Sequence, residues 1–259
     1  MSRSNVAQAD APFGVVGTPI HEWRESQSLA RTPPITIDAL IPRGARLVIA
    51  APHPDDEVLA CGGLLAAMAD RVEDLHLISV TDGDASHPGS TLWPVHRLRA
   101  QRQVESESAL TRLGLDLSRL SWQRLGLPDA RVGEHEAILI RAFAKVLRKG
   151  DFILATWRHD GHGDHEAVGR AAAQAARGCG ATLLEVPVWA WHWAHPEDPR
   201  LPWGRAHKLH LDDDQLARKR EAIRAHASQL HDDPSTGAAP VLDRATLDRL
   251  LQPFELVFT

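Results

Sequence analysis

The chain is poor in cysteine and contains no tyrosine. Only Cys61 and Cys179 are present among 259 residues, which is too few for a disulfide framework. They also lie too far apart in the sequence to suggest a zinc knuckle, so we expect two reduced thiols. The absence of tyrosine excludes a phenol group from any catalytic role, although eight tryptophans are available.

Long apolar runs and a surplus of positive charge are also missing. No stretch of about 18 apolar residues occurs, and residues 1–13 are polar and acidic where a signal peptide would have an apolar core. We therefore expect no membrane span and a cytoplasmic location. The net charge of -5 argues against a nucleic-acid partner, because binding to phosphates needs a basic surface.

From Arg46 onward, short apolar runs alternate with longer amphipathic stretches, which is typical of β-α-β units. We therefore predict one α/β domain over residues 45–259, a Rossmann-like three-layer sandwich with a mostly parallel sheet. Residues 1–44 lack a clear period and are expected to form an extended arm that contacts the domain through Trp23. The expected strands are 47–51, 75–81, 152–156, 182–193 and 207–211, and the expected helices are 54–69, 96–113, 134–148, 164–177 and a late one near 216–230.

An acidic cluster, His53-Pro54-Asp55-Asp56-Glu57, follows the first expected strand. Proline favours the first position of a helix, so we place Pro54 there and both aspartates in the first turn. His53 and Asp56 can then face one point, while Asp55 projects about 100° away from Asp56. One carboxylate can bind a metal ion while its neighbour stays free.

A histidine-rich segment, His159-Asp160-Gly161-His162-Gly163-Asp164-His165, follows the strand expected at 152–156. Either segment alone would indicate helix capping, but both stand at the carboxyl ends of strands, where α/β sheets collect their ligands. His165 can complete a tripod of two imidazoles and one carboxylate that leaves a fourth position for water, as in catalytic zinc sites. Zinc lowers the pKa of a bound water to about 7, so Asp55 needs little basicity to take its proton.

The two segments resemble the motifs of the PIG-L/LmbE family of metal-dependent de-N-acetylases, which act mostly on N-acetylglucosamine-containing substrates. The likeness extends to Arg102-Gln103-Val104-Glu105 and to the segment 219–229, and it covers the chain from residue 45 onward. It implies an LmbE-like fold and hydrolysis of an N-acetyl group on an amino sugar or sugar conjugate. The implied cofactor is Zn²⁺, with Fe²⁺ as the alternative.

The resemblance also implies roles for individual residues. The zinc ligands are His53, Asp56 and His165, and Asp55 is the general base that activates the zinc-bound water.

His162 stabilises the oxyanion in this family pattern, with Asp164 orienting it, and either Asp55 or His162 protonates the leaving amine. Some sugar deacetylases of the family carry a tyrosine just before the second motif. This chain has His159 and Asp160 there instead, so details that depend on the tyrosine do not carry over.

Three residues are candidates for contact with the substrate: Asp84, which follows the strand at 75–81, Arg102 and Asp160. Arg102 either binds substrate or solvates a helix. Trp189, Trp191 and Trp193 alternate, so in a strand they would share one face and form either core or a platform for sugar rings.

Two other functions stay open at this stage. A metal-dependent phosphoesterase would need a second metal ion and a second set of carboxylates, for which Asp82, Asp84 and Asp160 are candidates. A non-catalytic sugar-binding protein of the same fold would have no use for Asp55 as a spare base. The sequence identifies neither the N-acyl substrate nor the oligomeric state.

Overall fold

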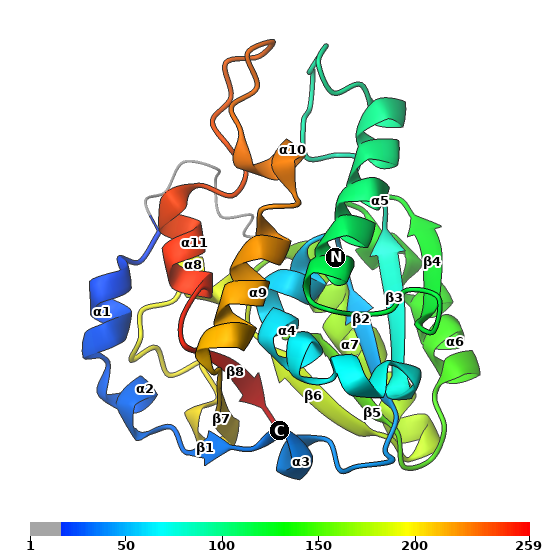
Figure 1. Cartoon of the computed structure of the whole chain (residues 1–259), viewed down its shortest axis with the longest axis vertical. Helices are drawn as coiled ribbons and strands as arrows, with labels where there is room; N and C mark the ends of the chain where they lie inside the picture. The colour runs from blue at the N-terminus through cyan, green and yellow to red at the C-terminus, as the bar shows by residue number, and fades with distance from the viewer. Residues whose placement is uncertain (1–16) are drawn as a thin grey trace, which may run out of the picture.

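The computed structural model describes residues 17–259. They contain an eight-stranded sheet in the order β1-β7-β8-β6-β5-β2-β3-β4 (Figure 1). Strand β8 is antiparallel to both of its neighbours and the other pairs are parallel, which confirms the predicted α/β fold. The strands are Pro34–Ile35 (β1), Leu47–Ala51 (β2), Leu75–Thr81 (β3), Ser121–Leu127 (β4), Phe152–Thr156 (β5), Thr182–Val186 (β6), Ala206–His210 (β7) and Phe254–Phe258 (β8).

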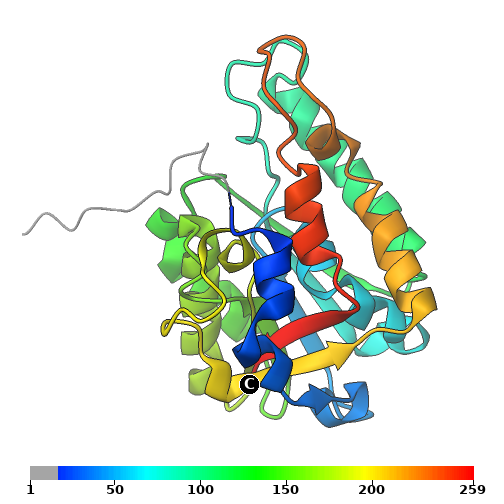
Figure 2. The same ribbon diagram turned by 90° about the vertical axis from the view of Figure 1, so that its left-hand side faces the viewer.

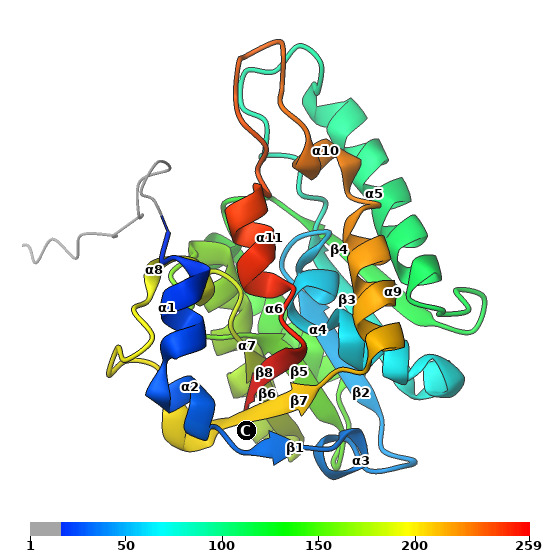
Figure 3. The ribbon, with the colours of Figure 1, turned by 60° about the vertical axis from the view of Figure 1, so that its left-hand side comes forward.

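Helices cover both faces of the sheet, as Figures 1 and 3 show. Helices α4 and α9 pack on each other over one face, and α6 and α7 cover the other. The helices are Ile20–Glu25 (α1), Gln27–Arg31 (α2), Ile37–Leu40 (α3), Asp56–Ala67 (α4), Val95–Arg112 (α5), Glu136–Val146 (α6), Gly163–Cys179 (α7), Ala190–Trp193 (α8), Asp213–Ile223 (α9), Ala227–Leu230 (α10) and Arg244–Leu250 (α11), with 3₁₀ turns at 69–74, 132–135 and 203–205. None of these helices is both long and apolar enough to cross a membrane.

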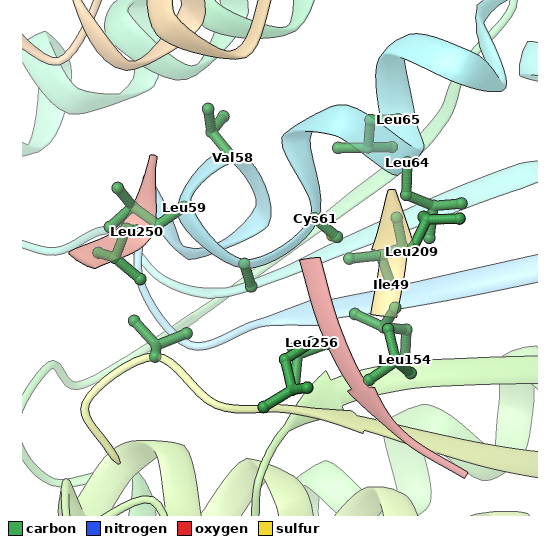
Figure 4. Packing of buried hydrophobic residues seen from close by; sticks show 14 of the residues in the cluster. Ile49, Val58, Leu59, Cys61, Leu64, Leu65, Leu154, Leu209, Leu250 and Leu256 are labelled. Atoms are coloured by element: carbon green, nitrogen blue, oxygen red, sulfur yellow. The ribbon is translucent and has the colours of Figure 1, made fainter. Parts of the chain in front are cut away.

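Successive side chains of a strand point to opposite faces of the sheet. Because helices cover both faces, each central strand is buried on both sides. In β2, Leu47 and Ile49 belong to the core under α4, whereas Val48 and Ala50 belong to the core under α6 and α7. Figure 4 shows the first of these cores, where apolar side chains of α4 pack on those of β2, β5, β7 and β8. Strands buried on both faces explain why their sequences are continuous apolar runs.

Helix α4 is interrupted at Cys61, whose φ of −142° and ψ of 28° are not helical. The carboxylate of Glu255 on β8 accepts hydrogen bonds from the N–H groups of Gly63 and Leu64, at 2.7 and 2.9 Å. The buried Lys219 on α9 donates to the same carboxylate at 2.7 Å. This contact ties the second half of α4 to β8 and α9.

Helix α7 approaches the end of β5 at Gly169. A Cβ at this position would lie 2.5 Å from the carbonyl oxygen of Thr156 and 2.7 Å from the backbone nitrogen of Arg158. His165 lies one turn before Gly169 in α7, and its carbonyl oxygen accepts a hydrogen bond from Oγ1 of Thr156 at 2.9 Å. The missing side chain at Gly169 therefore lets α7 place His165 against the strand end.

The strand predicted over 182–193 is wrong beyond Val186, because Pro187 follows and the chain turns into α8. The three alternating tryptophans therefore do not share a face. Trp191 is buried against Trp23, with ring centroids 4.6 Å apart. Trp189 stacks on His192, and Trp193 donates from its indole to the carbonyl oxygen of Asp160 at 2.6 Å.

Other boundaries also differ from the prediction. Helix α4 begins at Asp56, so Pro54 and Asp55 precede it, and the late helix is divided into α9 and α10. Residues 17–44, part of the segment expected as an extended arm, hold α1, α2, α3 and the edge strand β1. Figure 2 shows α1 beside α11. The first 16 residues of that segment lie outside the described part.

Candidate metal centre

The two predicted motifs meet at the carboxyl ends of β2 and β5. Nδ1 of His53 lies 3.1 Å from Oδ2 of Asp56 and 3.3 Å from Nε2 of His165. The same His165 nitrogen lies 3.4 Å from Oδ2 of Asp56. One donor atom from each of the three residues thus falls within 4.8 Å of the others, and the three predicted ligands come together.

The donor set fits zinc. Two imidazoles and one carboxylate are borderline ligands that Zn²⁺ accepts in catalytic sites, where a fourth position stays open. The side chains of His53, Asp56 and His165 are 13%, 4% and 5% exposed, so a bound ion would be largely shielded from bulk solvent.

Charge is balanced locally among the three groups. Burial by itself would lower the pKa of His165, but Asp56 and Asp160 outweigh it and raise that pKa to about 9. Burial likewise opposes ionisation of Asp56, yet His165 and His53 hold the pKa of this carboxyl well below its ordinary value. Asp56 is therefore an anion, ready to bind a cation.

Asp160 orients His165 instead of contacting substrate, so the prediction for this residue is wrong. Its carboxylate has an exposed fraction of 0% and lies 2.7 Å from Nδ1 of His165. It also accepts the backbone N–H groups of Val188, Trp189 and Ala190 at 2.7–3.0 Å. A carboxylate behind a ligand histidine fixes its tautomer and leaves Nε2 for the metal.

The carboxylate of Asp164 faces His53, so the predicted role of Asp164 in orienting His162 stays a prediction. Oδ2 of Asp164 lies 3.2 Å from Nε2 of His53, and the carboxylate also accepts the backbone N–H groups of Ala130 and Val132 at 2.8 and 2.9 Å. Only its own N–H contacts His162, donating to Nδ1 at 3.3 Å.

Asp129 is a site residue that the sequence analysis missed. Its Oδ1 lies 3.2 Å from Nε2 of His53, and its Oδ2 accepts the N–H of Ala85 at 2.8 Å. The residue that follows, Ala130, adopts a φ of 63°, which is uncommon for a residue with a side chain. Asp129 follows β4 directly after Pro128, so the rule that ligands gather at carboxyl ends would have identified it once β4 was recognised.

Asp55 is the residue before α4 and has a strained backbone, with φ 153° and ψ −27°. Arg102 of α5 holds its carboxylate, because Nη2 donates to Oδ2 at 2.8 Å and to the carbonyl oxygen of Pro54 at 2.7 Å. Nη1 of Arg102 donates to the carbonyl oxygen of Gly83 at 2.9 Å. Burial raises the pKa of Asp55 to about 6, against the opposing charge of Arg102.

Arg102 was predicted to bind substrate or solvate a helix, and the structure contradicts both. Its exposed fraction is 3%, and its Nη atoms are used by Asp55 and by two backbone carbonyl groups. A polar helix face in the sequence gave no sign that this guanidinium is buried beside a carboxylate.

His162 precedes α7, and its ring centroid lies 4.5 Å from that of His165 and 5.0 Å from that of His53. Burial and the two neighbouring imidazoles lower the pKa of His162 to about 3. The ring is therefore neutral. Because Nδ1 accepts the N–H of Asp164, its proton belongs on Nε2.

Two loops rise beside the site at residues 82–94 and 231–241 (Figures 1 and 3). Ser235 joins them, since its Oγ accepts the N–H groups of Thr91 and Leu92 at 3.1 and 3.3 Å. At the base of the first loop, Asp84 pairs with Arg99, whose Nε donates to Oδ2 at 3.0 Å. Its side chain is 13% exposed, so contact between Asp84 and a substrate remains a prediction.

Residues 47–176, which include both motifs, match the model of a protein family described as "PIG-L: GlcNAc-PI de-N-acetylase". A 1D-myo-inositol 2-acetamido-2-deoxy-alpha-D-glucopyranoside deacetylase from Corynebacterium glutamicum is 26% identical to the chain over 238 residues. That alignment covers 72% of this chain and 76% of the relative.

Solved structures share the fold. A deacetylase of the teicoplanin biosynthesis pathway superposes with a TM-score of 0.62 at 18% identity, over 83% of this chain and 97% of its own. An N,N'-diacetylchitobiose deacetylase from Pyrococcus horikoshii gives a TM-score of 0.54 at 21% identity, over 73% and 72% of the two chains. A zinc-inhibited form of teicoplanin deacetylase gives 0.59 at 19% identity, over 83% of this chain and 97% of that one.

Proposed function

The chain belongs to the PIG-L family of de-N-acetylases, and from this premise we propose that it hydrolyses the N-acetyl group of an N-acetylglucosamine-containing conjugate. The observation that carries the proposal is the position of Asp55 beside a complete ligand set. His53, Asp56 and His165 present three donor atoms to one point. Asp55 is left out of that set and held by Arg102.

These three residues would hold the metal ion. When bound, zinc would polarise the amide carbonyl and lower the pKa of a water molecule, which makes the attack feasible near neutral pH. Each imidazole is held by carboxylates on the side away from the proposed ion. Asp160 contacts His165, and Asp129 and Asp164 contact His53.

Asp55 is proposed as the general base. With a pKa of about 6 it is mostly ionised at neutral pH, so it can accept the proton of the attacking water. The proton then resides on Oδ of Asp55, from which it can pass to the leaving amine as the C–N bond breaks. Arg102 keeps the carboxylate in one orientation during both transfers.

His162 is proposed to stabilise the developing oxyanion as a neutral hydrogen-bond donor. Its Nε2–H points away from the contact with Asp164, and a single preorganised donor of this kind is worth about 3–4 kcal/mol in the transition state. Because the pKa of His162 is only about 3, an imidazolium is not available to protonate the leaving group. We therefore propose that Asp55 protonates the leaving amine.

The substrate is proposed to be an N-acetylated amino sugar joined to a further group, with water as the acyl acceptor. The relative from Corynebacterium glutamicum is named for an inositol glycoside of N-acetylglucosamine, and the one from Pyrococcus horikoshii for a disaccharide. A two-metal phosphoesterase is not favoured. The carboxylates that a second metal ion would need are already paired, Asp160 with His165 and Asp84 with Arg99. A binding protein without activity would not need Asp55 beside the ligands.

The test compares Asp55→Asn with Asp56→Asn in a screen for acetate release from N-acetylated sugar conjugates. We expect Asp55→Asn to keep one metal ion per chain and to lose about 10²–10⁴-fold in kcat, the range for a general base. Asp56→Asn should lose the metal ion as well, as measured by elemental analysis. The proposal would be wrong if the wild-type protein bound no stoichiometric metal ion. It would also be wrong if Asp55→Asn released acetate at the wild-type rate.

A further inference from the structure

His226, the residue before α10, is buried without a hydrogen-bond partner for its ring. Its exposed fraction is 0%, and in the described structure neither Nδ1 nor Nε2 meets a donor or acceptor. Oε1 of Gln229 and Nε of Arg102 are among the other buried atoms in the same state. Folded proteins rarely leave such groups unsatisfied, and ordered water supplies the partner where the protein does not.

His226 and Gln229 belong to the segment of α10, which packs on α5, the helix that carries Arg102. Ser228 donates to Glu105 of α5 through its N–H at 2.8 Å and through Oγ at 2.7 Å, which fixes α10 on α5. Arg102 lies one turn before Glu105, so both are on the same side of that helix. Gln229 donates through Nε2 to Oγ of Ser228 at 2.8 Å, which places its amide beside the same contact.

The unsatisfied atoms have complementary chemistry. Burial lowers the pKa of His226 to about 3, with Arg102 as the charge that contributes most to the shift, so the ring is neutral. It then offers one N–H donor and one nitrogen acceptor. Nε of Arg102 adds a donor and Oε1 of Gln229 adds an acceptor. Water can join such a set because it both donates and accepts.

We propose that a buried water site lies between α5 and α10, bounded by His226, Gln229 and Arg102. Through it, His226 acts as a positioning residue for Arg102 and, one contact further, for Asp55. The Nη atoms of Arg102 are already bonded to Asp55, Pro54 and Gly83. A partner for Nε fixes the remaining edge of the guanidinium plane, which sets the direction of the bond to Asp55. The positioning role rests on the proposed function, since it matters only if Asp55 transfers protons.

A crystal structure of the metal-loaded protein that resolves ordered water tests the site directly. We expect density for at least one water within hydrogen-bond distance of a His226 ring nitrogen and of Nε of Arg102. A direct bond between the two side chains, or dry apolar packing around the ring, overturns the water site. This result does not depend on finding a substrate.

The positioning role is tested with His226→Leu and His226→Gln. Leucine fills the space without polar atoms, and we expect kcat to fall about tenfold to hundredfold with little change in KM, as for a misplaced catalytic group. Glutamine keeps a donor and an acceptor and should recover most of the loss. His76→Leu is the matched control, because His76 also has a buried unpartnered nitrogen but lies at the amino end of β3, away from the site.

Wild-type kcat in His226→Leu would contradict the positioning role. Equal losses in the leucine and glutamine variants, together with a lower unfolding temperature in both, would show that the ring is only structural and would also overturn it. If the wild-type protein released no acetate from any conjugate, the proposed function would fail, while the crystal structure would still decide whether the water site exists.

Discussion

The imidazole of His53 connects two groups of carboxylates, because each ring nitrogen faces a different set. Nδ1 faces Asp56, whereas Nε2 faces Asp129 and Asp164. A ligand histidine that donates to a carboxylate through its other nitrogen keeps one tautomer and becomes a stronger ligand. Metal affinity should therefore depend on residues that never touch the ion.

Asp129→Asn tests this dependence. The amide is a weaker acceptor than the carboxylate, so we expect the affinity for zinc to fall about 10–100-fold, as for other partners of ligand histidines. A competition titration against a chelator measures the change. Asp84→Asn is the control, because Asp84 pairs with Arg99 and not with a ligand. Equal zinc affinities in Asp129→Asn and wild type would contradict the role given to Asp129.

The pH dependence of activity should report Asp55. This residue accepts a proton only as a carboxylate, and burial raises its pKa to about 6. The rate should therefore fall as the pH drops below 6, approaching tenfold per unit. A bound divalent cation favours the ionised form of Asp55, so it would move the acid side of the pH–rate profile to lower pH.

The profile of kcat/KM against pH checks the assignment when it is repeated with Arg102→Gln. Arg102 lowers the pKa of Asp55, so its removal should move the acid limb toward neutral pH. A limb at the same pH in the variant and in wild type would show that another group is being titrated.

Among the helices, α7 carries both a proposed metal ligand, His165, and a close contact with the sheet. Gly169→Ala would push a methyl group into the backbone at the end of β5, where the nearest atom is 2.5 Å away. We expect the free energy of unfolding to fall by about 1–3 kcal/mol, as for other overpacked sites, and zinc binding to weaken because His165 moves with the helix.

Gly178→Ala, in the same helix, is the matched control. Nothing lies within 4 Å of a Cβ at Gly178, so alanine should stabilise the protein by up to about 1 kcal/mol through its helix propensity. Urea unfolding of both variants gives the comparison. Equal stabilities for the two alanine variants would mean that α7 has room to shift.

The elements differ in how well their sequences predict them. The strands at 47–51, 75–81 and 152–156 match the prediction because burial on both faces makes them continuous apolar runs. Strand β4 was not predicted, because its side chains are half exposed and follow no clear pattern. The alternation of Trp189, Trp191 and Trp193 suggested a strand, but Pro187 has no N–H to donate to a ladder.

For the molecule as a whole, the bound metal ion should be a major source of stability. The three proposed ligands come from segments about a hundred residues apart, and an ion that binds only the folded chain stabilises it by mass action. At a free zinc concentration of 1,000 times Kd this amounts to about 4 kcal/mol, or roughly 10 °C in unfolding temperature for a chain of this size.

Removal of zinc with a chelator should therefore lower the unfolding temperature, and added zinc should restore it, as followed by calorimetry. Asp56→Asn serves as the control and should respond to neither treatment. If the chelator left the unfolding temperature of the wild-type protein unchanged, this would indicate that no ion is bound between the two motifs.

The sequence predicted the meeting of the two motifs but not what lies behind them. The ligand triad follows from strand ends that share one edge of a sheet. The partners Asp129, Asp160 and Arg102 depend on loop conformation and on which side of a helix is buried, and neither has a periodic signature. A positive φ at Ala130, for example, leaves no trace in residue type.

Ser235 has a consequence for engineering. One hydroxyl group joins loops that are about 145 residues apart in sequence and that stand together beside the metal centre. A graft that changes the backbone path of residues 82–94 alone would move the two N–H groups away from Ser235 and remove this contact between the loops. A change of substrate specificity by loop exchange therefore calls for transfer of the two loops together.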